Sequence, residues 1–213
     1  MKKTIKKGLY FITDRTGYSE EEFLQVIDQV CSEGISLLQL REKNLSHYDL
    51  LSLAKKVKII AEKYQVDLII DDNVDIAKEI SCGVHLGADD MPIARAREIL
   101  GEDAIIGATA KSLDRALESQ KEGADYLGVG AIYPTKTHVK TKITSVETLD
   151  EIIAGVDIPV FAIGGLREDN LEVLKDTNIH GICIVSRIMQ AEDPKKQTRL
   201  VKEALGKIIN IDI

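Results

Sequence analysis

The strongest constraint on the fold is a regular alternation of short apolar segments with amphipathic ones along the 213-residue chain. In residues 20–33, Phe23, Val26, Ile27 and Val30 recur at the i, i+3, i+4 and i+7 spacing of a helix that buries one face. Similar helical patterns cover residues 48–64, 113–122, 146–154 and 197–209. Eight apolar segments read as strands, at residues 8–13, 35–40, 66–70, 83–86, 104–108, 124–132, 158–163 and 181–185.

A strand followed by a helix, repeated through the chain, predicts a parallel sheet covered by helices. The third repeat is the weakest, since residues 74–81 allow only about two helical turns at ~3.6 residues per turn. The pattern alone also permits an open, doubly wound sheet. Eight units favour closure, because a barrel leaves no exposed edge strand. We therefore predict a single (β/α)8 TIM barrel that forms one domain over residues 1–213.

Helix starts carry their own signals. Ser19, Ser46, Ser112, Ser145 and Asp169 stand where N-caps are expected, because a short polar side chain can accept a hydrogen bond from a free amide of the first turn. Aromatic residues make up only 4% of the chain and tryptophan is absent, so an aliphatic core is expected.

Net charge and composition limit the partners. A formal charge of −7 argues against a general nucleic-acid binder, which needs a basic face, so an anionic small ligand must be held by a local group of cations. No apolar segment approaches the ~18 residues of a membrane span, and no membrane partner is expected. The three cysteines form no metal-ligand pattern, and we interpret them as reduced thiols of a cytoplasmic protein.

Polar residues follow the second predicted strand. Gln39, Arg41 and Lys43 share one face at a spacing of two residues, and the apolar segment before them indicates an interior strand. Arginine offers a planar fork for phosphate and lysine a point charge, so an anionic ligand is the natural partner. The alternative is a surface strand end with solvated charges.

Carboxylates follow the third and fourth strands, as Asp71-Asp72 and Asp89-Asp90. Active sites of closed β/α barrels lie at the carboxyl ends of the strands, where these acids would face Arg41. Mg2+ commonly binds one or two carboxylates together with substrate phosphates and water. Asp71 and Asp89 are equally well explained as turn formers or as acids of a helix start.

The last three strands end in segments suited to phosphate. Gly128 and Gly130 lead into a polar loop with Thr135, Lys136 and Thr137, and on its own this is a weak signal. The pairs Gly164-Gly165 and Val185-Ser186 follow strands seven and eight, where backbone amides form the usual phosphate site of such barrels. His85 lies inside a strand. We interpret it as a core or rim residue whose hydrogen bonds are satisfied, in preference to a catalytic residue.

Taken in order, these segments resemble the thiamine-phosphate synthase family across essentially the whole chain. The matching segments are YFITD (10–14), QLREK (39–43), DNVDIA (72–77), GVHLG (83–87) with Asp90, GADYLG (123–128), YPTKT (133–137), IGG (163–165) and Val185-Ser186. The resemblance implies a transferase that joins hydroxymethylpyrimidine pyrophosphate to a thiazole phosphate, giving thiamine phosphate and pyrophosphate.

The resemblance also implies roles for individual residues. Gln39, Arg41 and Lys43 would hold the pyrimidine pyrophosphate, and Asp72 and Asp90 would bind a Mg2+ cofactor. The remaining substrate contacts would come from Asp71, Thr109, Thr135, Thr137, His138, Gly165, Val185 and Ser186. Arg41, Lys43, Thr109 and His138 are the residues expected to act in catalysis. Small molecules are the expected partners, and homo-oligomer formation is left open.

Four positions depart from the family pattern: Ala88 replaces glutamine, Thr109 serine, Asp71 asparagine, and His138 a lysine that assists the departing pyrophosphate. Threonine keeps the hydroxyl of serine. At a reference pKa of ~6.5 a histidine is largely neutral near pH 7, though a nearby pyrophosphate favours its charged form. We expect activity to persist with an altered pH dependence, with Lys136 or Lys140 as possible substitutes.

Two other functions fit the same barrel. A thiazole tautomerase would bind one thiazole phosphate and need neither a pyrophosphate clamp nor a metal, and a phosphate-sensing barrel would lack the metal carboxylates. Arg41, Lys43, Asp72 and Asp90 are all present, and they favour the synthase over both.

Overall fold

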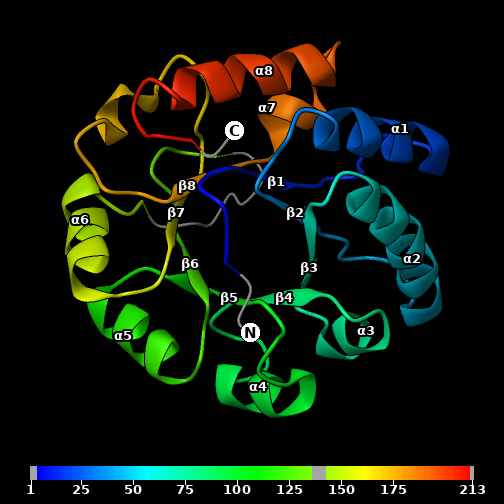
Figure 1. Ribbon diagram of the computed structural model, residues 1–213, viewed down its shortest axis with the longest axis horizontal. Helices are drawn as coiled ribbons and strands as arrows, with labels where there is room; N and C mark the ends of the chain where they lie inside the picture. Colours follow the sequence, from blue (N-terminus) through cyan, green and yellow to red (C-terminus); the bar gives the residue numbers. More distant parts are fainter. Residues whose placement is uncertain (1–3, 136–142, 212–213) are drawn as a thin grey trace.

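A computed structural model describes residues 4–135 and 143–211. Eight parallel strands form a closed barrel in chain order, because β1 pairs with both β2 and β8. Helices surround this barrel, as Figure 1 shows from one end. The prediction of a (β/α)8 barrel is confirmed, and the open sheet is excluded by the pairing of β1 with β8.

The strands are short and the helices vary in length. The strands are β1 Gly8–Ile12, β2 Leu37–Leu40, β3 Asp67–Asp71, β4 Gly83–Leu86, β5 Ile106–Ala110, β6 Tyr126–Gly130, β7 Val160–Ile163 and β8 Gly181–Ile184. The helices are α1 Glu20–Cys31, α2 His47–Lys63, α3 Val74–Glu79, α4 Ile93–Leu100, α5 Leu113–Lys121, α6 Val146–Gly155, α7 Ser186–Met189 and α8 Pro194–Leu205, with a 3-10 turn, η1, at Leu171–Leu174.

Four of the five expected N-caps are confirmed. The side chains of Ser19, Ser46, Ser112 and Ser145 each accept a hydrogen bond from the amide three residues on. The expectation for Asp169 is wrong, because the segment after β7 forms only the short turn η1, and the Asp169 carboxylate accepts from Arg167 Nε at 3.1 Å.

The last helix was also predicted too late in the chain. It begins at Pro194, with Asp193 as its N-cap, and ends at Leu205. Proline fits the first helical position because its missing amide hydrogen would have no partner there. The apolar periodicity of residues 197–209 concealed this start.

The buried side chains form two groups. The larger lies between the strands and the helices and is mainly aliphatic, with Phe11, Phe23, Cys31 and Met189 as its other members. The smaller fills the inside of the barrel and consists of Ile5, Tyr10, Ile12, Leu37, Ile69, Ile105, Tyr126, Phe161 and Cys183. The expectation of an aliphatic core is therefore wrong for the interior, where three aromatic rings meet edge to face at 5.6–5.7 Å between centroids.

Glycines on the inner face of the strands make room for these rings. A Cβ atom at Gly107 would lie 2.0 Å from Tyr126 Cζ, and one at Gly181 would lie 2.8 Å from Phe161 Cε1. The rings therefore occupy volume that side chains would fill in a barrel without these glycines. The rings fill the interior of the barrel, and polar groups lie toward the carboxyl ends of the strands.

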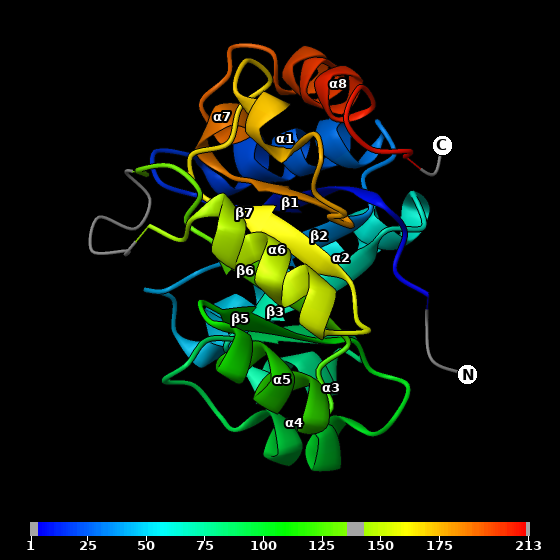
Figure 2. The same cartoon turned by 90° about the vertical axis from the view of Figure 1, so that its left-hand side faces the viewer.

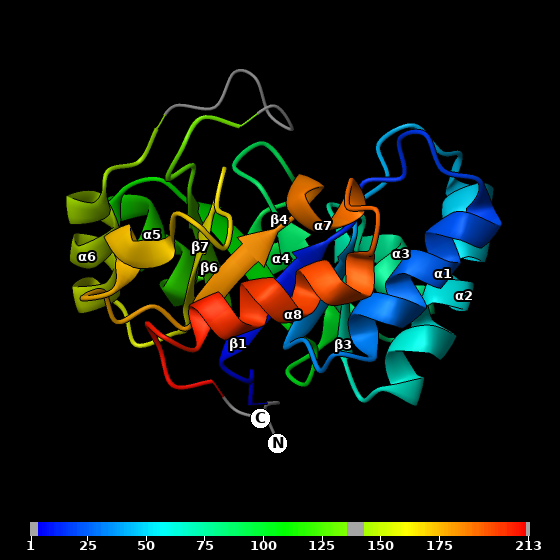
Figure 3. The ribbon, with the colours of Figure 1, turned by 90° about the horizontal axis from the view of Figure 1, so that it is seen from above.

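Both described chain ends lie at the end of the barrel where the strands begin, as Figures 2 and 3 show. A Cβ at Gly8 would lie 3.3 Å from Ile211, so the end of the described chain packs beside the start of β1. The opposite end of the barrel carries the loops that follow the strands and is left for chemistry.

Gly107→Ala is expected to lower the free energy of unfolding by about 1–3 kcal/mol, because the new methyl group must displace the Tyr126 ring. Gly206→Ala is the matched control, since Gly206 has a helical φ of −63° and its Cβ would make ordinary contacts. We expect that control to change stability by less than about 1 kcal/mol. Chemical denaturation of both variants tests this, and equal losses would contradict the assignment.

Candidate active site

Charged residues gather where β2, β3 and β4 end. Lys43 Nζ lies 2.6 Å from Asp71 Oδ2 and also contacts the Asp72 carboxylate, while Arg41 Nε lies 3.9 Å from Asp71 Oδ2. Burial lowers the pKa of Lys43, but the hydrogen bonds to Asp71 and Asp72 outweigh it, so the net shift is upward and the amine stays charged. The backbone of Arg41 is fixed through its amide, which donates to Thr13 Oγ1 at 3.0 Å.

Asp72 and Asp90 bring two carboxyl groups together. Asp72 has a φ of 60°, and its amide donates to His85 O at 2.9 Å, which turns it toward the start of the loop after β4. Asp90 Oδ2 accepts from the amide of Gly87 at 2.6 Å. The two side chains lie close enough for each to shift the pKa of the other.

The pKa values of this pair shift in opposite directions. Burial raises the pKa of Asp90, and the adjoining Asp72 raises it further. Burial also acts to raise the pKa of Asp72, but the hydrogen bond from Lys43 outweighs it and the net shift is downward. Two carboxyl groups in contact repel when both are ionised, so a cation bound between them would relieve the repulsion.

Asp72 and Asp90 suit a hard cation only if a bound ligand supplies further oxygen atoms. Within residues 4–135 and 143–211, no group of three or more His, Cys, Asp or Glu side chains is placed to hold a metal. Asp89 is exposed, which agrees with the turn-former interpretation. Asp72 and Asp90 could supply two oxygen ligands, and Mg2+ normally completes its shell with phosphate oxygens and water. The residues present fit Mg2+ on those terms.

A buried chain of hydrogen bonds links two other predicted residues. Gln39 Nε2 donates to Tyr10 Oη at 2.6 Å, and Tyr10 Oη lies 2.7 Å from Tyr126 Oη. The ring nitrogens of His85 then lie 3.0 Å from Tyr126 Oη and 3.0 Å from Thr109 Oγ1. We call this set the barrel chain.

The barrel chain was only partly predicted from sequence. Gln39 and Thr109 were expected at the site, and His85 was interpreted as a satisfied core or rim residue, which agrees with its two partners. Tyr10 and Tyr126 were missed. The signal was there, since both alternate along their strands with residues that face the helices. Burial raises the pKa of both tyrosines well above its usual value and lowers that of His85.

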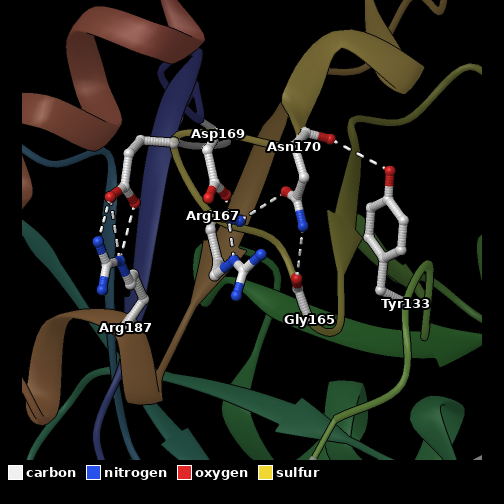
Figure 4. A network of polar contacts seen from close by, with 7 residues as sticks. Tyr133, Gly165, Arg167, Asp169, Asn170 and Arg187 are labelled. Carbon is white, nitrogen blue, oxygen red and sulfur yellow. Dashed lines mark hydrogen bonds and ion pairs between the residues drawn. The ribbon is translucent and has the colours of Figure 1, made fainter.

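Gly165 lies in a second cluster, formed by the loop after β7 and drawn in Figure 4. Gly164 and Gly165 have φ values of 102° and 64°, which L side chains rarely adopt. Asn170 Nδ2 donates to Gly165 O at 3.0 Å, and Asn170 O accepts from Tyr133 Oη at 3.3 Å. Asn170 thus joins the Gly165 turn to the segment after β6.

An ion pair missed by the sequence analysis joins the loops after β7 and β8. Arg187, in α7, donates from Nε and Nη2 to both carboxylate oxygens of Glu168 (Figure 4). Arg187 lowers the pKa of Glu168 to about 2. This pair ties α7, which begins at Ser186, to the loop after β7. Its distance in sequence, 19 residues, gave no pattern to predict it from.

The expected contacts on the loop after β6 are covered only in part. Thr135 is half-buried at the end of the described segment. Thr137 and His138, with Lys136 and Lys140, lie outside the described residues. The exposed Ala88 replaces the expected glutamine on the loop after β4.

Comparison with known proteins decides the family. A family model for thiamine monophosphate synthase matches residues 9–188. This chain belongs to the thiamine monophosphate synthase family. The thiamine-phosphate synthase of Clostridium tetani is 45% identical over 195 residues, covering 91% of this chain and 93% of its own. The thiamine-phosphate synthase of Enterococcus faecalis is 47% identical over 188 residues, covering 88% and 89%.

A solved structure agrees with this family. The thiamine phosphate pyrophosphorylase of Pyrococcus furiosus superposes with a TM-score of 0.88 at 35% identity, over 97% of this chain and 98% of that one. A 3-hexulose-6-phosphate synthase, at 17% identity and a TM-score of 0.69, shares the fold alone. Within the described segments of the chain, no helix is both long enough and apolar enough to cross a bilayer.

The Glu168–Arg187 pair predicts a pH dependence of stability. The Glu168 pKa falls from 4.5 to about 2 on folding, so the pair stabilises the protein above pH about 4.5 and loses this effect as pH falls toward 2. In Glu168→Gln the unfolding temperature should lie below that of the parent at pH about 5, and the gap should shrink by pH about 2.5. Thermal unfolding across this range measures it. A gap that stays constant would show that the shift is absent.

Proposed function

We propose that this chain joins hydroxymethylpyrimidine pyrophosphate to a thiazole phosphate, releasing pyrophosphate and forming thiamine phosphate. Its family and the names of its relatives support this activity. The observation that carries the proposal is the convergence of Arg41, Lys43, Asp72 and Asp90 at the mouth of the barrel. A pyrophosphate needs both positive charge and a cation site, and this cluster offers both.

The pyrimidine pyrophosphate is assigned to the ends of β2 to β5. Arg41 and Lys43 would meet the phosphate oxygens with their donors, and Gln39 lies deeper, where a ring can approach it. Thr109 lies in β5, and its hydroxyl lies 3.0 Å from Nε2 of His85, whose carbonyl accepts from the Asp72 amide. Asp71 is assigned to orienting Lys43, since its Oδ2 forms an ion pair with that amine at 2.6 Å.

Asp72 and Asp90 would hold Mg2+, with phosphate oxygens completing its shell. Bound there, the metal would neutralise charge on the departing pyrophosphate. Asp90 is held for this by the amide of Gly87, and Asp72 by the carbonyl of His85. The Asp90 carboxylate and the Asp72 backbone are thereby fixed before any ligand arrives, which lowers the cost of ordering the site.

The reaction asks for positioning and charge stabilisation, not for a protein nucleophile. The pyrimidine amino group donates electrons as the C–O bond breaks, and the bonding pair leaves with the pyrophosphate. The lone pair of the thiazole nitrogen then forms the new C–N bond. Arg41 and Lys43 stabilise the leaving group, and His138 would assist it. Gln39 and the walls of the barrel hold the cation facing the thiazole.

The thiazole phosphate is assigned to the cluster after β7 and β8. Backbone amides of Gly165, Val185 and Ser186 would donate to its oxygens, and Thr135 and Thr137 would contact it from the loop after β6. The Glu168–Arg187 pair keeps the two amide-bearing loops together. We further propose a cytoplasmic location, supported by the free thiols of Cys31 and Cys183. Assembly into a homo-oligomer stays open.

The purified protein should form thiamine phosphate from the two substrates with Mg2+ and none after metal chelation. Asp90→Asn should reduce kcat/KM by at least about a hundredfold, because one of the two carboxylate ligands becomes neutral. Asp89→Asn, on the exposed neighbour, is the matched control and should keep its activity. Chromatography of the product measures both. No product from folded protein would contradict the proposal and point to the tautomerase instead.

A further inference from the structure

The barrel chain crosses the inside of the barrel from β2 to β5. Its members come from five strands, β2, β1, β6, β4 and β5 in that order, and β2 and β6 lie on opposite sides of the barrel (Figure 1). Tyr10 and Tyr126 are 1% and 0% exposed, whereas Thr109 is half-buried at the mouth. The barrel chain thus connects the buried interior to the end of the barrel where ligands are proposed to bind.

The available hydrogens set the donor-to-acceptor direction of the hydrogen bonds in the barrel chain. Gln39 Nε2 donates to Tyr10 Oη. Because a buried donor is rarely left without an acceptor, we assign the hydroxyl hydrogen of Tyr10 to its other described partner, Tyr126. Tyr126 then has one hydrogen left and one partner left, which is Nδ1 of His85.

His85 passes this direction on. With Nδ1 accepting, a neutral imidazole carries its hydrogen on Nε2, which donates to Thr109 Oγ1. The hydroxyl hydrogen of Thr109 is therefore not used by His85. It is free to be donated to a ligand at the barrel mouth.

We propose that Tyr126 is a positioning residue that fixes His85 in the Nε2–H form and thereby presents the Thr109 hydroxyl as a donor to a phosphate oxygen. The inference rests on the proposed function for the identity of that ligand. Phosphate oxygens only accept hydrogen bonds, so a hydroxyl committed to donating to His85 could not serve them. Lys43, paired with Asp71 at the end of β3, marks this end of the barrel as an anion site.

Two glycines pack against the side chains of the barrel chain. Gly128 faces His85, and a Cβ there would lie 3.4 Å from the imidazole Cε1, so the ring packs against the β6 backbone. Gly107 leaves the space that Tyr126 fills, which sets its hydroxyl opposite Nδ1. An apolar ring in place of Tyr126 would fill the same space without selecting a tautomer of His85.

The direct test is nitrogen NMR of protein labelled with 15N-histidine, read at the His85 ring. The proposal predicts a pyridine-type Nδ1 and a protonated, pyrrole-type Nε2 in the unmodified protein, and loss of that preference in Tyr126→Phe. Tyr10→Phe is the matched control. It removes a buried hydroxyl from the same interior but leaves the Tyr126–His85 bond, so the Nε2–H form should remain. A protonated Nδ1 in the unmodified protein would reverse the direction of the hydrogen bonds in the barrel chain and overturn the proposal.

Binding of inorganic pyrophosphate with Mg2+ gives a readout that does not depend on turnover. Tyr126→Phe should weaken it about tenfold, the scale of one hydrogen bond to a charged group, and Tyr10→Phe by less than about threefold. Thr109→Val should weaken it to a similar extent as Tyr126→Phe. Adding Tyr126→Phe to Thr109→Val should cost nothing more, because Tyr126 acts through that hydroxyl.

Two results would overturn the inference: additive losses in the double variant, or equal losses in Tyr126→Phe and Tyr10→Phe. If Tyr126→Phe fails to fold, the state of His85 in the unmodified protein and the loss in Thr109→Val still test it. Failure of the synthase proposal looks different. The protein would then form no thiamine phosphate while the NMR and pyrophosphate results stood.

Discussion

The limited volume inside the barrel is the constraint on which the rest of this structure depends. Gly107 and Gly181 have no side chain, and Tyr126 and Phe161 occupy the space that this leaves. The rings pack edge to face with Tyr10 and close the lower barrel. Because two of the three rings carry a hydroxyl, the apolar plug ends in polar atoms just below the site. Packing and chemistry are therefore set by the same few residues.

Charge is arranged locally and against the overall balance of the protein. The chain has a net charge of −7, yet Arg41 and Lys43 stand together at the mouth of the barrel. Three carboxyl groups, of Asp71, Asp72 and Asp90, face these two cations. Burial raises the pKa of Asp90, and the neighbouring Asp72 raises it further. A pyrophosphate alone would add to the excess, whereas a pyrophosphate that shares a divalent cation with the carboxylates relieves it.

Much of the fold could be predicted from the sequence because its signals are local. Strand segments, serine caps and polar residues at strand ends are each read within a few positions, as for Ser19 with Glu22 or Gln39 with Arg41. Features that depend on register between strands could not be read this way. The pairing of Asp71 with His85 across β3 and β4 determines which groups meet at the site, and no sequence pattern states it. The Glu168–Arg187 pair and the aromatic interior belong to the same class.

The central claim is that the site is completed by its ligand, since the described residues provide two carboxylates and no third metal ligand beside them. Electron paramagnetic resonance of Mn2+, a close analogue of Mg2+ for oxygen ligands, tests it most directly. The account predicts weak Mn2+ binding to the protein alone and binding at least about tenfold tighter once inorganic pyrophosphate is added, with the gain lost in Asp72→Asn. Equal Mn2+ affinity with and without pyrophosphate would contradict it.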